Sequence, residues 1–135
     1  MKEFEHFSNC LKVLKKADFE KTTESEIYRI GVIAQFNLTF ELSCKALQEV
    51  LRIHGVEGAV VGAPGEILQL AYKVGFISDT STWLQMLKKR KLAIHIYSED
   101  KADELVSLIR DRFISTFTIL EEKLKAKIDN AANEL

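Results

Sequence analysis

Residues 34–51 read AQFNLTFELSCKALQEVL. Phe36, Phe40, Leu47 and Leu51 recur at steps of four and seven residues, which places them on one side of a helix. Other apolar residues lie on the same line or widen it: Ile30, Ile33 and Cys44 on the line, and Val32, Leu38, Leu42 and Ala46 beside it. A helix this apolar is expected at the centre of the molecule, with neighbours on several sides.

The ends of this helix are predicted from capping signals. Residues 18–23 form a polar link, and Thr23 is a plausible N-cap with Glu26 three residues later as a capping box. The helix should then run to about Ile53. Glu41 interrupts its apolar middle. It is either exposed on the far side or buried as the partner of a cation, and we favour the second reading.

The remaining helices follow from the same periodicity. Residues 2–17 form the first helix, and a loop with four glycines, 55–65, leads to a short helix that begins at Pro64 and ends at Gly75. The loop lacks the Lys-Ser/Thr of a P-loop and is read as a connector. A further helix starts near residues 80–81 and ends between Ala93 and His95. The last helix starts at Ser98 or Asp100 and carries a long apolar stripe: Leu105, Ile109, Phe113, Phe117, Leu120, Leu124 and Ile128.

These elements predict an all-α fold. We expect an antiparallel up-down four-helix bundle with an extra short helix in a crossover, forming a single domain over residues 1–135. Hydrophobic residues make up 47% and charged residues 29% of the chain, and there is one proline, which suits a globular helical protein.

The composition also bounds the partners and the compartment. A net charge of −1 excludes a basic surface all over the molecule, so any grip on RNA must be local. Cys10 and Cys44 fall at helical spacing among apolar residues and are read as small core residues rather than a disulfide or a metal site. The N-terminus carries charges throughout, and the uncharged run of residues 30–40 is too short to span a bilayer. We expect a cytoplasmic protein without a membrane partner.

Residues 88–97, KKRKLAIHIY, carry the strongest chemical signal. The four cations are an RNA grip, half of a catalytic site or the solvated end of a helix, where cations offset the helix dipole. RNA cleavage without a metal needs a base for the 2′-hydroxyl proton and a cation for the phosphate at the transition state. His95 and Arg90 are the right residue types. Lys88, Lys89 and Lys91 would hold the phosphate backbone.

Arg90 and His95 would not share one stripe of a continuous helix, because five residues correspond to about 140° of rotation. Either the helix ends near Ala93 and His95 lies on the following turn, or two protomers combine their residues in one cleft.

The residues quoted so far resemble a known family. Residues 34–51 and then 63–97, APGEILQLAYKVGFISDTSTWLQMLKKRKLAIHIY, are similar in order and spacing to the nucleotidyltransferase substrate-binding protein family. Arg90 and His95 fall on the R-x4-H signature of the wider HEPN superfamily, and Tyr97 completes R-x4-H-x-Y. The resemblance covers roughly residues 4–125.

This resemblance implies a helical homodimer formed through the motif-bearing helices, which binds a minimal nucleotidyltransferase. In the toxin–antitoxin branch it implies a HepT-like, metal-independent endoribonuclease that needs no cofactor. Its nucleotidyltransferase adds AMP to the tyrosine at the position of Tyr97. The chain departs from the family pattern at Lys91, Asn37, Gln69 and Cys44. A non-catalytic substrate-binding subunit of the nucleotidyltransferase therefore remains the alternative.

Overall fold

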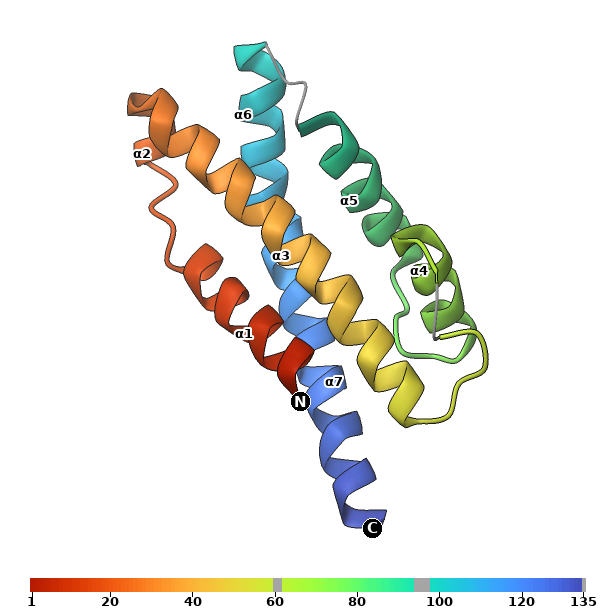
Figure 1. The fold of residues 1–135 in the computed structure, drawn as a ribbon. Coiled ribbons are helices and arrows are strands. Elements are labelled where there is room, and N and C mark those ends of the chain that lie inside the picture. Colours follow the sequence, from red (N-terminus) through yellow and green to blue (C-terminus); the bar gives the residue numbers. More distant parts are fainter. Residues whose placement is uncertain (60–61, 94–97, 135) are drawn as a thin grey trace.

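A computed structural model describes residues 1–59, 62–93 and 98–134 of the chain. Four long helical segments alternate in direction (Figure 1). They are α1 (Lys2–Lys15), α3 (Glu26–Ile53), α5 (Thr80–Ala93) and the continuous run of α6 (Glu99–Leu108), a π-helical turn (Ile109–Phe113) and α7 (Ile114–Glu134). The short helices α2 (Lys21–Glu24) and α4 (Pro64–Lys73) lie in the first two connections. The prediction of an antiparallel up-down bundle with a short crossover helix is confirmed.

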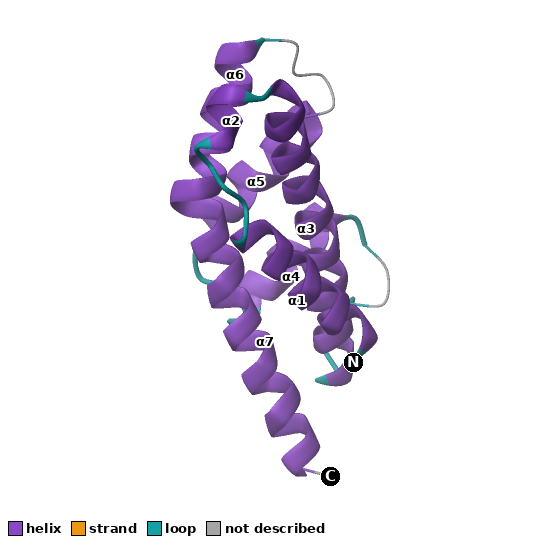
Figure 2. Cartoon of the chain, turned by 90° about the vertical axis from the view of Figure 1, so that its left-hand side faces the viewer, coloured by secondary structure: helices purple, strands orange, loops and turns teal. Residues whose placement is uncertain are grey.

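The described residues are helical apart from short connections, as the side view shows (Figure 2). No helix in the described ranges is long and apolar enough to cross a membrane.

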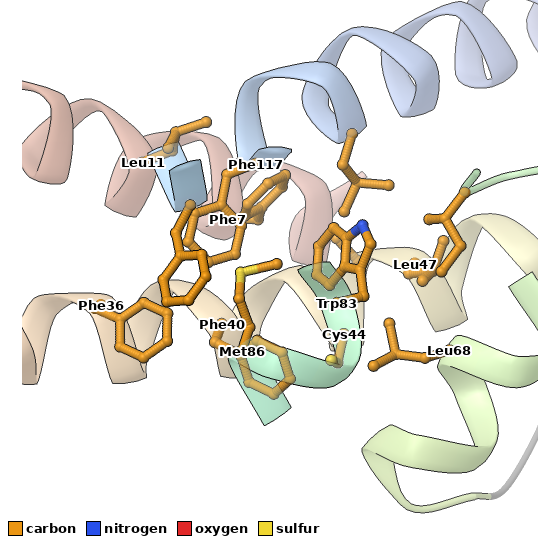
Figure 3. Packing of buried hydrophobic residues seen from close by; sticks show 14 of the residues in the cluster. Phe7, Leu11, Phe36, Phe40, Cys44, Leu47, Leu68, Trp83, Met86 and Phe117 are labelled. Carbon is orange, nitrogen blue, oxygen red and sulfur yellow. The ribbon is translucent and has the colours of Figure 1, made fainter. Parts of the chain in front are cut away.

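Helix α3 is central, as its apolar sequence predicted, and packs against every other α-helix. Phe36 stacks on Phe113 with ring centroids 5.3 Å apart and also meets Phe40 and Phe117. Figure 3 shows Phe36, Phe40 and Phe117 beside Phe7 of α1 and Trp83 and Met86 of α5. The rings bring α1, α3, α5 and the last helix into one buried cluster.

Two residues of the predicted buried side of α3 are exposed. Ile30 is 58% and Leu38 is 44% exposed, whereas Phe36, Phe40 and Leu47 are fully buried. Both lie on the outward side of α3. An apolar pattern cannot distinguish a core position from an apolar position that faces outward.

The N-cap of α3 is Ser25, so the prediction of Thr23 was wrong. The Ser25 hydroxyl accepts a hydrogen bond from the Tyr28 amide, while the Thr23 hydroxyl donates to the Glu20 carbonyl within α2. Residues 21–24 form a helical turn of their own, and this moves the start of α3 two residues along. The other boundary signals hold: Pro64 opens α4, and the Ser98 hydroxyl caps α6.

The predicted last helix contains a π-helical turn at Ile109–Phe113. Leu105, Ile109, Phe113 and Phe117 are separated by three consecutive four-residue steps. At 100° per residue, three such steps would turn the stripe about 120° away from its start. The wider turn compensates for that rotation, and all four side chains are buried.

The two free cysteines differ in their surroundings. Cys44 is 5% exposed, which confirms it as a core residue, and Cys10 is half-buried. Burial raises the pKa of the Cys44 thiol to about 12, against smaller opposing effects from a hydrogen bond with Ser43 and the nearby charge of Arg90. The thiol is therefore neutral throughout the physiological range.

This raised pKa predicts a loss of stability at alkaline pH. In the unfolded chain a cysteine thiol has a pKa of about 8.5, whereas the Cys44 thiol of the folded protein keeps its proton to a much higher pH. The contribution of this thiol to the free energy of unfolding is fully present below the pKa of the unfolded thiol. It is lost as the pH rises above that value, at up to about 1.4 kcal/mol per pH unit. Urea unfolding at pH 8, 9 and 10 with a reductant should therefore show a steeper decline for the natural chain than for Cys44→Ala. Parallel declines for the two proteins would contradict a raised pKa of the Cys44 thiol.

Candidate functional site

The start of α5 is fixed by a hydrogen-bonded cap. The Thr82 amide and hydroxyl donate to the two carboxylate oxygens of Asp79, at 3.0 and 2.6 Å. These two bonds, the hydroxyl's first, hold the pKa of Asp79 below its usual value. Arg112, in the π-helical turn, donates to the Thr82 hydroxyl at 2.8 Å and to Gln85 at 2.9 Å. The helix that carries the cations is thereby tied to the last helix.

The three cations that are described at the other end of α5, Lys88, Lys89 and Arg90, have different surroundings. Lys88 is exposed to solvent. The Lys89 ammonium lies 3.4 Å from the Glu104 carboxylate of α6, a surface pair of small energetic value. Arg90 continues the buried stripe of Trp83 and Met86, and its guanidinium carbon lies 5.8 Å from the centroid of the Phe40 ring. Of the cations that the structure describes here, Arg90 is the one directed toward α3.

Arg90 is held by packing rather than by an acid. Within the described part of the chain, no carboxylate lies close enough to the Arg90 guanidinium to form an ion pair. Glu41 is exposed, so the favoured reading of a buried partner for a cation was wrong. The guanidinium lies against the Phe40 ring, and among the described residues it has no hydrogen-bond or ion-pair partner.

The other predicted site residues are not placed. His95 and Tyr97 lie outside the described residues, as does the side chain of Lys91. Gln69 is exposed on α4. The arrangement of Arg90 relative to His95 stays a prediction.

Asn37 is an unusual polar residue on this side of α3. It precedes Phe40 by three residues and Glu41 by four, so it shares the side of α3 on which Arg90 lies. Its Oδ1 atom is buried and accepts no hydrogen bond from the residues that the structure describes. An unpaired buried acceptor costs roughly 1–3 kcal/mol, which a donor from a ligand or a partner would recover.

Arg29 was missed by the sequence analysis. It is 8% exposed near the start of α3, and its guanidinium lies 3.4 Å from Glu99 and 3.5 Å from Asp103 of α6. These pairs link the start of α3 to the beginning of α6, which follows residues 94–97. The signal was present in the sequence, because Arg29 precedes Phe36 by seven residues and so lies on the buried line of that helix.

The side chains at this end of the molecule are cationic and suit the binding of an anion. Among residues 1–59, 62–93 and 98–134, no group of three or more His, Cys, Asp and Glu side chains is arranged to hold a metal ion. The described part offers an oriented guanidinium and an exposed lysine, whose donors suit a phosphate or another oxyanion. The Asn37 carboxamide oxygen is an acceptor and would instead take a donor such as a hydroxyl group.

Comparisons with known proteins agree with this fold. Over 107 residues the chain is 28% identical to the probable ribonuclease HepT of Haemophilus influenzae, covering 78% of this chain and 73% of that protein. A crystal structure of a Thermus thermophilus protein superposes with a TM-score of 0.68 at 27% identity, covering 90% of this chain and 97% of that one.

A second solved structure, from Haemophilus influenzae, is described as having the fold of a substrate-binding domain of a nucleotidyltransferase. It superposes with a TM-score of 0.66 at 23% identity and covers 91% of this chain and 94% of that one.

The family model described as "nucleotidyltransferase substrate binding protein like" matches residues 2–126, nearly the whole chain. With the bundle, the central α3 and the cation-bearing α5 in place, the chain belongs to the family of nucleotidyltransferase substrate-binding-like proteins.

Proposed function

We propose that this protein is the HEPN-type partner subunit of a minimal nucleotidyltransferase and acts as a HepT-like toxin that cleaves RNA without a metal. The observation that carries the proposal is the state of Arg90. Its guanidinium is oriented over Phe40, in a half-buried position, without an ion pair to any described carboxylate. An arginine held in this way has its donors free for phosphate oxygens. The similarity to a probable ribonuclease supports the same reading.

In the proposed reaction the 2′-oxygen of RNA attacks the adjacent phosphorus. His95 takes the proton of the 2′-hydroxyl, Arg90 stabilises the charge on the phosphoryl oxygens, and the 5′-oxygen leaves with a proton from His95 of the partner subunit. The products are a 2′,3′-cyclic phosphate and a 5′-hydroxyl. The proposed reaction uses no cofactor or metal.

The lysines have a separate role in this proposal. Lys88 and Lys91 hold the RNA backbone without base specificity, and Lys89 joins them when RNA displaces its pair with Glu104. Their contribution is to binding and depends on salt, whereas that of Arg90 and His95 is to the rate.

Variants of these residues separate catalysis from charge. With RNA in EDTA, His95→Ala and Arg90→Lys should each lower the single-turnover cleavage rate by on the order of 100-fold or more, because the ammonium lacks the two-pronged contact. Lys88→Ala should leave that rate nearly unchanged and lower the log–log salt slope of single-stranded RNA binding by about 0.7. Circular dichroism controls for folding.

Two outcomes would favour other readings. Equal effects of Arg90→Lys and Lys88→Ala would mean that the run is a general cationic surface. Absence of cleavage, with tight binding to the nucleotidyltransferase retained, would establish the alternative of a non-catalytic substrate-binding subunit.

We also propose that the active form is a homodimer, with α5 close to the interface. Support comes from the outward side of α3, where Ile27, Gly31, Ala34 and Leu38 are exposed at steps of four, three and four residues. Ile27 is 84% exposed, and the half-exposed Ile30 borders this seam. Such spacing is typical of a helix seam that packs on another helix.

The seam is self-complementary. Two antiparallel copies of α3 would place Ile27 against Leu38 of the partner subunit and Gly31 against Ala34 of the partner subunit, so that small residues meet at the centre. Arg90 lies on the side of α3 that adjoins this face. The dimer would therefore bring two copies of the α5 end to the same interface.

A charge in the seam should dissociate the dimer. Ala34→Glu would bring two like charges together at the two-fold axis, at a cost of about 3 kcal/mol, or roughly 100-fold in the dimer Kd. Analytical ultracentrifugation should find the natural chain dimeric at micromolar concentration and this variant monomeric. Ser115→Glu, an equal charge at an exposed position of α7, is the control. A monomeric natural chain, or a dimeric Ala34→Glu, would overturn the proposed interface.

The proposed partner is a minimal nucleotidyltransferase that acts as antitoxin by transferring AMP to Tyr97. The phenol oxygen would attack the α-phosphorus of ATP and release pyrophosphate. Tyr97 follows His95 by two residues, so a bulky anionic adduct there would compete with RNA for the same cations.

Co-expression with a nucleotidyltransferase that is active on ATP should therefore add one AMP per chain. Intact mass spectrometry detects the adduct, Tyr97→Phe should abolish it, and Tyr72→Phe, which alters an exposed tyrosine of α4, should leave it in place. An unmodified natural chain, after co-expression with a partner shown to be active, would rule out this mode of control.

A further inference from the structure

A cavity of about 270 Å³ lies between α3, the start of α4 and the end of α5. Glu41, Lys45 and Gln48 line it from α3, Ile67 from α4 and Arg90 from α5. Glu41 and Lys45 are exposed at its rim, whereas Ile67 and the neutral thiol of Cys44 give it an apolar wall. It is thus a mixed site, with charges on one side and apolar surface on the other.

The charges in the cavity favour an anion. Arg90 and Lys45 outweigh Glu41 by one formal charge. The N-terminus of α4 also borders the cavity at Pro64. Pro64 has no amide hydrogen and the Glu66 amide donates to the Ala63 carbonyl, so this helix end acts on an anion mainly through its dipole. A helix N-terminus adds about half a positive charge. The guanidinium, with no ion pair to a described carboxylate, supplies the fork that fits phosphate oxygens.

Glu41 narrows the class of anion. A carboxylate at the rim repels a bare phosphate, but it accepts hydrogen bonds from hydroxyl groups. A phosphate ester that carries hydroxyls would place its phosphate on Arg90 and Lys45 and its hydroxyls on Glu41. A volume of 270 Å³ is just below that of ordinary small-molecule sites and suits a ligand of this size.

We propose that this cavity binds the ribose-phosphate unit of a nucleotide, with Arg90 and Lys45 on the phosphate and Glu41 on the ribose hydroxyls. The unit belongs either to a free mononucleotide or to the 5′-phosphorylated end of an RNA, since both present the same chemistry. The inference deepens the proposed function, with which it shares Arg90, and extends the site to residues of α3 that the R-x4-H signature does not include.

Calorimetric titration of the full chain tests the proposal with inorganic phosphate, ribose 5-phosphate, AMP and a short 5′-phosphorylated RNA. Ribose 5-phosphate should bind more tightly than inorganic phosphate. Lys45→Ala should raise the Kd for ribose 5-phosphate roughly tenfold, which is the effect of losing one charge-assisted contact. Lys15→Ala, an exposed lysine of α1, is the matched control and should bind as the natural chain does.

Glu41→Gln provides an independent test, because it removes the repulsion and weakens the acceptor. It should bind inorganic phosphate more tightly and lose most of the preference for ribose 5-phosphate. If AMP binds as tightly as the 5′-phosphorylated RNA, the ligand is the free nucleotide. If the RNA binds markedly more tightly than AMP, the ligand is the RNA terminus.

The proposal is overturned if the natural chain shows no saturable binding of ribose 5-phosphate at millimolar concentration, or if Lys45→Ala binds it as the natural chain does. His95→Ala separates this result from the proposed ribonuclease. If that variant and the natural chain both bind ribose 5-phosphate but neither cleaves RNA, the ribonuclease fails and the cavity stands. If the natural chain cleaves RNA but binds no sugar phosphate, the proposed ribonuclease stands and the proposed cavity ligand fails.

Discussion

The packing of Phe36 and Phe40 on α3 is the contact on which the rest of the structure depends. Phe36 meets the rings of Phe113 and Phe117, and Phe40 meets both Trp83 and the Arg90 guanidinium. One helix therefore orients the last helix and α5 at once. A change in the Phe40 ring would alter both the core and the support of the guanidinium, so the stability of the core and the geometry of the site are coupled through this side chain.

The sequence predicted the elements better than their edges. Periodicity identified the four long helices because each buries a continuous apolar stripe, and Phe36, Phe40 and Leu47 were correctly assigned to the core. It failed for Ile30 and Leu38, because an exposed apolar seam lies beside the buried one on α3. Capping signals were ambiguous where two hydroxyl residues stand close together, and the turn of α2 made Ser25 the cap in place of Thr23.

The candidate site was only partly predictable for a different reason. Residue type and spacing suggested the chemistry of Arg90, but its position over Phe40 depends on how α5 crosses α3, which is a tertiary property. The same holds for Glu41, whose exposure is set by the neighbours of α3 rather than by the apolar residues around it in sequence. The ion pairs of the buried Arg29 with two exposed acids on α6, Glu99 and Asp103, join segments that lie far apart in the sequence.

The π-helical turn at Ile109–Phe113 has a consequence for how this chain compares with its relatives. A wide turn of this kind holds one more residue than a regular helix of the same length. Loss of a residue there would restore regular winding and keep Phe117 and Leu124 on the core, whereas the same loss further along α7 would rotate everything beyond it by about 100°. A homologue one residue shorter is therefore best aligned with its gap inside this turn.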